Sequence, residues 1–230
     1  MIKKTALAIA AVAAGVSAQA QDEAAKSDLS VTVDVTYVSD YVFRGEKLAD
    51  ASIQPSVEAT YGDFYAGAWH SSELSHNDGD TETDLYAGYG LKINDTFSVD
   101  FGVTRYTYSG GSQDDSTEVY VGVSANVLLT PSVYYYYDFD NETYTIEGSV
   151  GYSLPIDAIN ASLDLSGKVG HVGAPGDDRT YFVVGAAVPY KLSDTATLTA
   201  GVDYIVNDGD RLIDNDEDGL VGKVGISIGF

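Results

Sequence analysis

Apolar and polar side chains alternate along most of the chain, from Leu29 to the last residue, Phe230. In the final stretch, every second residue from Leu220 to Phe230 is apolar or glycine, and Lys223 and Ser227 lie between them. A period of two predicts a β-strand, because successive side chains of a strand point to opposite faces. Twelve such stretches occur. Most of them reach the ~9–11 residues that a tilted strand needs to cross a membrane.

The connections between these stretches alternate between short and long. The short ones are residues 61–63, 93–95, 129–131, 155–157 and 191–194. The longer and mostly acidic ones are residues 44–50, 72–83, 109–116, 140–142, 172–179 and 207–219. Outer-membrane barrels have short periplasmic turns and longer outside loops, and a soluble sandwich does not need so many long strands. The rhythm therefore predicts an all-β, transmembrane antiparallel up-and-down β-barrel of about twelve strands over residues 29–230. We expect it in the outer membrane of a Gram-negative bacterium, with the N- and C-termini in the periplasm.

The N-terminus has the pattern of a secretory signal. Lys3 and Lys4 precede an Ala-rich apolar run, and Ala18-Gln19-Ala20 fits the small-x-small cleavage rule. We predict a signal peptide at residues 1–20 and a short periplasmic lead at residues 21–28. The apolar run is shorter than the ~18 or more residues of a membrane-spanning helix.

The chain is strongly acidic. Its formal net charge of −23 becomes −25 when Lys3 and Lys4 are removed with the signal peptide. This excess argues against a nucleic-acid partner, whose phosphates need Lys and Arg. It favours cation-rich surroundings and cation-selective transport. There is no cysteine, so disulfides and thiolate metal sites are excluded.

If the apolar faces point to lipid, the opposite faces line a lumen rich in carboxylates. A Lys or Arg facing lipid at mid-bilayer would cost ~2–4 kcal/mol, so the charged residues are expected to face inward. The predicted pore-lining residues are Asp34, Asp40, Arg44, Glu58, Asp84, Asp100, Glu118, Asp138, Glu147, Asp164, Lys168, Asp203 and Lys223. Two interiors remain open: a water-filled, cation-preferring pore, or a closed polar core in which the charges pair. The excess of acids over bases favours the pore, although twelve strands leave only a narrow passage.

Aromatic residues are divided between the two faces. Tyr135, Tyr137 and Phe139 fall on the lipid side, where they would join an interfacial girdle. Tyr134 and Tyr136 fall inward, where they would fill gaps or stack against sugars or another flat solute. Other inward candidates are Tyr86, Tyr120 and either Tyr65 or Trp69. The alternation does not settle the facing of the stretches near 64–71 and 180–190.

One loop contains half of a calcium-binding pattern. Asp214, Asp216 and Asp218 stand at every second position before Gly219, as oxygen ligands do in such loops. The closing glutamate would fall at Gly225, so the full pattern fails. A solvated acidic loop is the simpler interpretation. Surface Ca²⁺ or Mg²⁺ bridging to lipopolysaccharide is the alternative, and no other cofactor is expected.

An enzyme is not expected. The histidines are His70, His76 and His171, and His70 beside Ser72 or Glu73 is the arrangement that would suit an esterase acting on lipid. The chain has no phosphate loop, no nucleophile elbow and no metal-binding histidine cluster in its sequence.

Three stretches carry a family resemblance. They are residues 39–45 (SDYVFRG), 62–72 (GDFYAGAWHSS) and 82–89 (ETDLYAGY). These stretches, together with the chain length, the signal peptide and the C-terminal Phe, resemble the TorF family of proposed porins, also catalogued as the Gcw_chp family of uncharacterised bacterial proteins. The resemblance implies an outer-membrane barrel and no established substrate.

The first of these stretches comes where the first strand reaches its outer end. Continued alternation would place Tyr41 and Phe43 in the outer aromatic girdle, and Asp40 and Arg44 inward near the mouth. Four residues along one strand separate two side chains by ~13 Å, so each charge would need a partner on another strand. Arg44 would then either anchor a loop or set a constriction.

The main hypothesis is a porin-like channel for passive passage of small hydrophilic solutes, cation-preferring, with lipid and lipopolysaccharide around it. The alternative is a non-conducting barrel whose acidic outer loops bind divalent cations, lipopolysaccharide or a protein partner. The third hypothesis is a lipid-modifying enzyme. The sequence does not indicate the solute or the oligomeric state.

Overall fold

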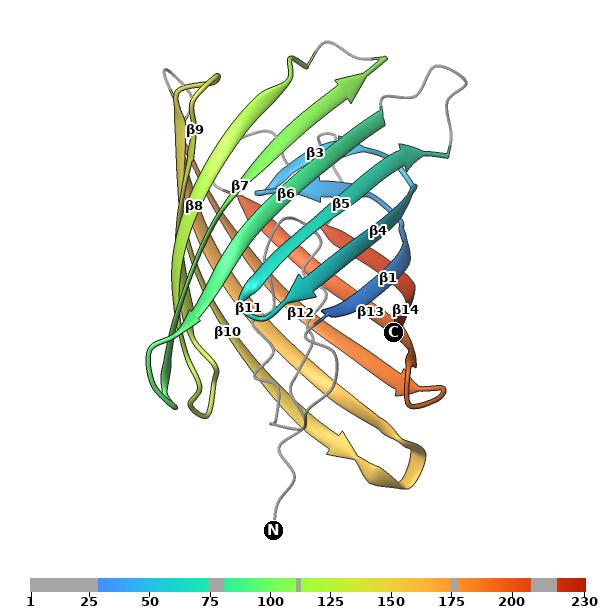
Figure 1. Cartoon of the computed structure of the whole chain (residues 1–230). Coiled ribbons are helices and arrows are strands. Elements are labelled where there is room, and N and C mark those ends of the chain that lie inside the picture. Colours follow the sequence, from blue (N-terminus) through green and yellow to red (C-terminus); the bar gives the residue numbers. More distant parts are fainter. Residues whose placement is uncertain (1–28, 75–80, 111–112, 175–177, 208–218) are drawn as a thin grey trace.

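Twelve strands close into an antiparallel barrel (Figure 1). The computed structural model describes residues 29–74, 81–110, 113–174, 178–207 and 219–230. The barrel strands are β1 (Leu29–Val38), β4 (Ser52–Tyr61), β5 (Phe64–Glu73), β6 (Thr81–Lys92), β7 (Phe97–Ser109), β8 (Ser116–Ala125), β9 (Ser132–Asp138), β10 (Thr143–Ile156), β11 (Ala161–Gly173), β12 (Arg179–Lys191), β13 (Ala196–Asn207) and β14 (Leu220–Gly229). The predicted fold class is confirmed.

The ring is completed by β1, which pairs with both β4 and β14. Val33 lies opposite Ile228 in the β1–β14 register. The amide of Phe230 donates to the carbonyl of Val31 at 2.9 Å, which ties the last residue beside the first strand. Both ends of the barrel chain therefore lie with the short turns, at what we call the turn end. At the opposite end, here called the loop end, the strands lead into the longer connections.

The outward side chains form the apolar surface that the alternation predicts. On β8, Val119, Val121 and Val123 are exposed, whereas Glu118 and Tyr120 are buried. Residues opposite each other in neighbouring strands point to the same side of a sheet. The same alternation of outward and inward side chains therefore continues from strand to strand around the ring. The outer face is therefore suited to lipid and the inner face to polar groups.

The structure fixes the facing of the two strands that the pattern left open. On β5, Phe64 is exposed and Tyr65 is buried, so Tyr65 and Trp69 both face inward. On β12, Phe182 is exposed and Tyr181 is buried. Both strands thus follow the same two-residue period as their neighbours.

Two strand ends differ from the prediction. β8 ends at Ala125, although alternation extended it to Val127. β10 continues to Ile156, and the turn expected at 155–157 is instead made after it by the 3₁₀ helix Asp157–Ile159. Alternation reports the facing of a residue, whereas the end of a strand depends on whether a partner is present to complete its backbone hydrogen bonds.

Two predicted segments lie outside the described residues: the signal peptide with its lead (1–28), and most of the acidic segment 208–219. In the parts of the chain that the structure describes, no helix is long and apolar enough to cross a membrane.

A lysine at the middle of the outer face should be costly. Val121→Lys places a charge at the centre of β8, on the lipid side, and should lower the free energy of unfolding by about 2–4 kcal/mol. Val127→Lys, in the turn after β8, is the control and should cost only about 0–1 kcal/mol, as near an interface. Urea unfolding in lipid vesicles, followed by the fluorescence of the single tryptophan, measures both. Equal costs at the two positions would contradict the assigned lipid-facing surface.

Candidate pore and the hairpin inside it

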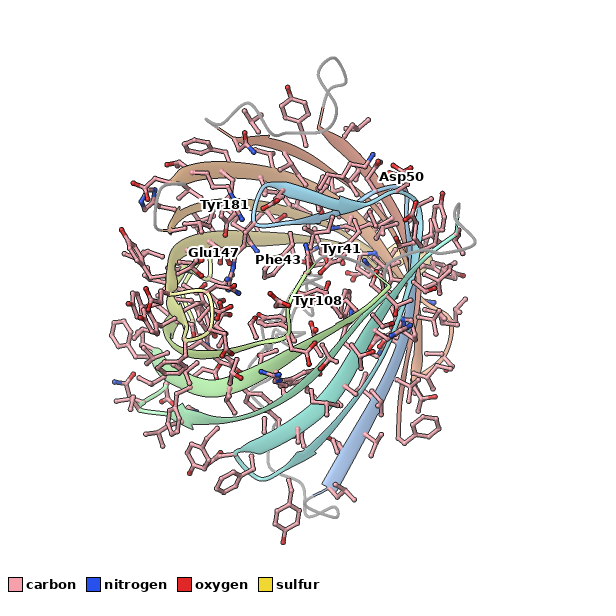
Figure 2. The ribbon with its side chains drawn as sticks, turned by 90° about the horizontal axis from the view of Figure 1, so that it is seen from above. Tyr41, Phe43, Asp50, Tyr108, Glu147 and Tyr181 are labelled. Carbon is pink, nitrogen blue, oxygen red and sulfur yellow. The ribbon has the colours of Figure 1, made fainter. Side chains whose placement is uncertain are left out.

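The connection between β1 and β4 folds back into the barrel. Residues 39–51, here called the inner hairpin, contain β2 (Tyr41–Phe43) and β3 (Glu46–Ala49), which form a two-stranded sheet separate from the barrel. Figure 1 shows this hairpin inside the upper part of the barrel, and Figure 2 shows it from above, within the ring of strands. Arg44 and Gly45 form its turn, with φ of 47° and 77°. Two positive φ values are what a tight two-residue hairpin turn requires.

The tip of the hairpin is fixed against β12 and β13. The side-chain amide of Asn207 donates to the Gly45 carbonyl at 2.7 Å. Arg179 donates through Nε to the Arg44 carbonyl at 3.2 Å and forms an ion pair with Glu46 at 3.1 Å. A Cβ atom on Gly45 would lie 2.6 Å from the Cβ of Tyr181, so the backbone of the tip touches the wall.

The Arg44 side chain reaches the opposite part of the wall. Its two terminal nitrogens donate to the two carboxylate oxygens of Glu118 on β8, at 2.6 and 2.8 Å. The guanidinium also lies 4.4 Å from the ring centre of Tyr136 on β9. Burial by itself lowers the pKa of Arg44, but the charge and hydrogen bonds of Glu118 outweigh burial and raise it. Arg44 is therefore charged, and this bidentate pair is of the strong kind.

Aromatic contacts hold the body of the hairpin against the other walls. The Tyr41 hydroxyl donates to Glu82 on β6 at 2.8 Å, and its ring lies 5.4 Å from that of Trp69 on β5. Phe43 packs 6.1 Å from Tyr106 on β7. Figure 2 shows Tyr41 and Phe43 on the side of the hairpin toward Tyr108. The hairpin thus contacts both sides of the barrel.

The base of the hairpin carries a second set of charges. Lys47 on β3 lies 2.7 Å from both Asp40 and Asp50, which come from the two arms. Burial lowers the pKa of Lys47, but hydrogen bonds to the two carboxylates outweigh this effect and raise it. These exposed or half-exposed pairs tie the arms together at the point where they join the barrel.

The predicted role of the segment 39–45 was therefore partly wrong. Tyr41 is 4% exposed inside the barrel and not in a lipid-facing girdle, and Phe43 packs beside it. Asp40 and Arg44 do not share a barrel strand, because β1 ends at Val38. The alternation in this segment does reflect β-structure, but the strands belong to the inner hairpin and not to the barrel wall. The structure shows that Arg44 binds Glu118 and so holds the hairpin to the wall of the barrel.

The other predicted pore-lining residues have their side chains on the inner face. At the loop half of the lumen, three acids have a basic partner. They are Glu118 with Arg44, Glu147 with Lys168 at 3.1 Å, and Asp203 with Lys223 at 2.6 Å. Asp138 accepts hydrogen bonds from the backbone of residues 140 and 141 and organises the turn between β9 and β10. Asp84, also inward, is buried beside Glu82.

The turn half of the lumen is different, because hydroxyl groups hold its acids. Tyr86 donates to Glu58 at 3.1 Å. Tyr65 and Tyr134 donate to the two oxygens of Asp100, at 2.9 and 3.3 Å.

Asp164 accepts a hydrogen bond from the Ser153 hydroxyl at 2.6 Å. Among the described residues, none of Glu58, Asp100 and Asp164 forms a salt bridge. Asp34 lies on the same inner face, opposite Ser56 and Ser227. The acids of this half of the lumen are therefore held by hydroxyl groups, in contrast to the ion pairs of the loop half.

Inner tyrosines lie along the wall over glycines of neighbouring strands. The ring of Tyr65 on β5 occupies the space where Gly88 on β6 would carry a side chain. Tyr120 on β8 covers Gly102 on β7 in the same way. A glycine in a strand often marks such a close approach. The rings thereby keep their hydroxyls beside the acids of adjacent strands.

Tyr134 and Tyr136 face inward and Tyr135 and Phe139 outward, as predicted. Sequence reasoning missed the inner tyrosines Tyr106, Tyr108 and Tyr181, which donate to Glu118, Glu82 and Glu147. The inward facing of two of them could have been predicted, because Tyr106 and Tyr108 alternate with the lipid-facing residues of β7.

The other predicted sites receive no support from the geometry. Among the residues that the structure describes, no group of three or more His, Asp or Glu side chains is arranged to hold a metal ion. Asp214, Asp216 and Asp218 lie outside the described residues. His70 faces outward, with Nδ1 2.9 Å from the Thr83 hydroxyl, whereas Glu73 belongs to the inner face of β5. The proposed pairing of His70 with Glu73 is therefore not formed.

Solved structures with a similar fold include porins and channels. The "KdgM porin" has a TM-score of 0.62 and 14% sequence identity over 86% of this chain and 99% of the porin. A second structure of it, "in complex with disordered oligogalacturonate", has a TM-score of 0.60, again at 14% identity, over 87% and 99% of the two chains. The NanC porin has a TM-score of 0.57 and 14% identity over 86% and 98%. The COG4313 outer membrane channel from Pseudomonas putida F1 has a TM-score of 0.50 and 11% identity over 90% and 97%. At these identities the likeness shows the fold alone.

No curated protein matches the sequence. A family model described as "Bacterial protein of unknown function (Gcw_chp)" matches residues 22–218, while the name TorF is not confirmed. Because the match covers most of the sequence, including every part of the barrel from β1 to β13, the chain belongs to the Gcw_chp family of bacterial proteins.

Proposed function

We propose that this protein is a porin-like channel of the outer membrane that passes small hydrophilic solutes and prefers cations. The closed barrel, its apolar outer face and its similarity in fold to porins support a channel. The short turns and both chain ends share one end of the barrel, which supports a periplasmic location for the termini.

The observation that carries the cation preference is the chemistry of the turn half of the lumen. Among the residues that the structure describes, Glu58, Asp100 and Asp164 are held by hydroxyl groups and form no salt bridge with Lys or Arg. Rings of carboxylates lower the energy of a passing cation and raise that of an anion. An acidic oligosaccharide such as the oligogalacturonate bound to the KdgM porin is the class of solute that this lining would repel.

Neutralising these acids should remove the preference. Glu58→Gln, Asp100→Asn and Asp164→Asn together should move the reversal potential in a KCl gradient toward that of an unselective pore, because the lining loses these charges but keeps its shape. The measurement is single-channel recording of refolded protein in a planar bilayer. Asp63→Asn with Asp95→Asn, two acids in the turns between strands, is the control and should leave the reversal potential close to that of the wild type.

Two results would contradict the proposal. Anion selectivity of the wild type would overturn the cation preference. A folded barrel that shows no conductance steps, either as wild type or with residues 40–50 replaced by a short Gly-Ser linker, would overturn the channel itself and favour a structural or binding role.

A further inference from the structure

We infer that the inner hairpin is a gate that closes the loop half of the lumen, and that the ion pair between Arg44 and Glu118 is its latch. The inference rests on the proposed channel. It adds that the described arrangement is the closed state and that opening requires the hairpin tip to leave the wall.

The first argument is burial around the hairpin. Inner-wall residues at its level have almost no exposed surface, although they face the lumen of a barrel. They are Gln54, Glu82, Thr104, Glu118, Tyr136, Thr145 and Tyr181, each between 0 and 5% exposed. Small, polar and aromatic side chains of β4, β6, β7, β8, β9, β10 and β12 are thus all covered. At this level the hairpin, with Tyr41 and Phe43 packed against the wall, adds its own cover to that of the neighbouring inner side chains.

The second argument is that the hairpin is independent of the barrel. β2 and β3 pair only with each other, so the backbone hydrogen bonds of the barrel do not change if the hairpin moves. The arms are joined at the base through Lys47, Asp40 and Asp50. The tip, in contrast, is held by contacts of Arg44, Gly45 and Glu46 with the wall. Tyr41 and Phe43 also hold the body of the hairpin against the wall. Opening therefore releases these contacts together with those of the tip, while the base stays joined to the barrel.

The third argument identifies the latch among the tip contacts. Arg44 is the residue that crosses from the tip, beside β12 and β13, to β8 and β9. The side chain of Arg44 is 10% exposed and that of Glu118 is 2% exposed, so water screens the pair weakly. Removing one partner of such a pair leaves the other charge buried without compensation, which is strongly unfavourable. That residual charge is relieved when the hairpin moves away and water enters.

The test is single-channel recording of the full-length refolded protein with either partner changed. Arg44→Gln and Glu118→Gln should each raise the ratio of open to closed time by about a hundred- to a thousandfold, the range that corresponds to losing one member of a buried pair. The exchange Arg44→Glu with Glu118→Arg restores opposite charges and should return the open fraction toward that of the wild type. Arg105→Gln is the matched control, because Arg105 also pairs with carboxylates but lies on the outer face of β7, and it should change nothing.

The outcomes separate this inference from the proposed function. Conductance in the wild type that neither single substitution alters would overturn the latch and leave the channel standing. A nearly silent wild type with frequent openings in both single variants, reversed by the exchange, supports the latch and the channel together. Silence of every variant, in protein shown to be folded by its unfolding transition, would overturn both. Openings in both single variants that the exchange does not reverse would overturn the ion pair as the latch.

Discussion

Replacing Gly45 with valine is expected to release the tip of the inner hairpin and to raise the single-channel conductance several-fold. Gly45 has a φ of 77°, and a Cβ there would lie 2.6 Å from the Cβ of Tyr181 and 3.3 Å from that of Asn207. A valine would therefore be strained by about 1–2 kcal/mol in its backbone and would also collide with the wall. The hairpin can relieve both by moving, because it is not part of the barrel sheet.

Two other measurements report the same displacement. Tyr41 packs against Trp69, the single tryptophan, so the fluorescence of Trp69 should shift when the hairpin leaves the wall. Trypsin should then cut after Arg44, whose side chain is enclosed in the native barrel.

Gly62→Val is the matched control for this prediction. Gly62 has a φ of 60°, but no atom lies within 4 Å of the place of its Cβ, so the substitution brings the backbone strain without the collision. It should leave the conductance, the fluorescence and the trypsin pattern unchanged. A similar gain in conductance in both variants would show that strain in general, and not contact at the tip, controls the passage.

Replacing Gly88 with valine is expected to destabilise the barrel by about 1–3 kcal/mol, the cost of overfilling a packed site. The phenol of Tyr65 occupies the space that a side chain at Gly88 would need. Moving that ring toward the barrel axis would break its hydrogen bonds to Asp100, at 2.9 Å, and to Tyr120, at 2.5 Å. The midpoint of urea unfolding in lipid vesicles measures the loss, and the conductance should fall because the ring enters the lumen.

Gly90→Val, two residues further along β6 on the same face, provides the comparison. No atom lies within 4 Å of its Cβ position, and valine is favoured over glycine in strands, so stability should be unchanged or slightly higher. If Gly88→Val were tolerated as well as Gly90→Val, the packing of tyrosine rings over wall glycines would not contribute to stability.

The fold was predictable because a membrane barrel repeats one simple constraint along its whole length. Each strand must place apolar residues in lipid and polar residues inside, so the period of two in residues such as Val119, Val121 and Val123 determined the strand count and the facing of the charges. The even count and the short connections determined that both chain ends share one end of the barrel. Strand ends were less certain, as Ile156 shows, because they depend on a partner strand.

The hairpin and the pairing of the charges required the tertiary structure. The sequence around Tyr41 and Phe43 alternates in the same way whether it continues a barrel strand or forms a hairpin inside the lumen, because both are β-structure. Contacts between residues far apart decide between them: Arg44 with Glu118, and Gly45 with Asn207. Such contacts follow from closure of the ring, which brings β8 and β13 to the same lumen. The sequence thus determined the barrel, the facing of most of its strands and the acidic character of its inner face. Only the tertiary structure decided which acids are neutralised and that residues 39–51 occupy the lumen.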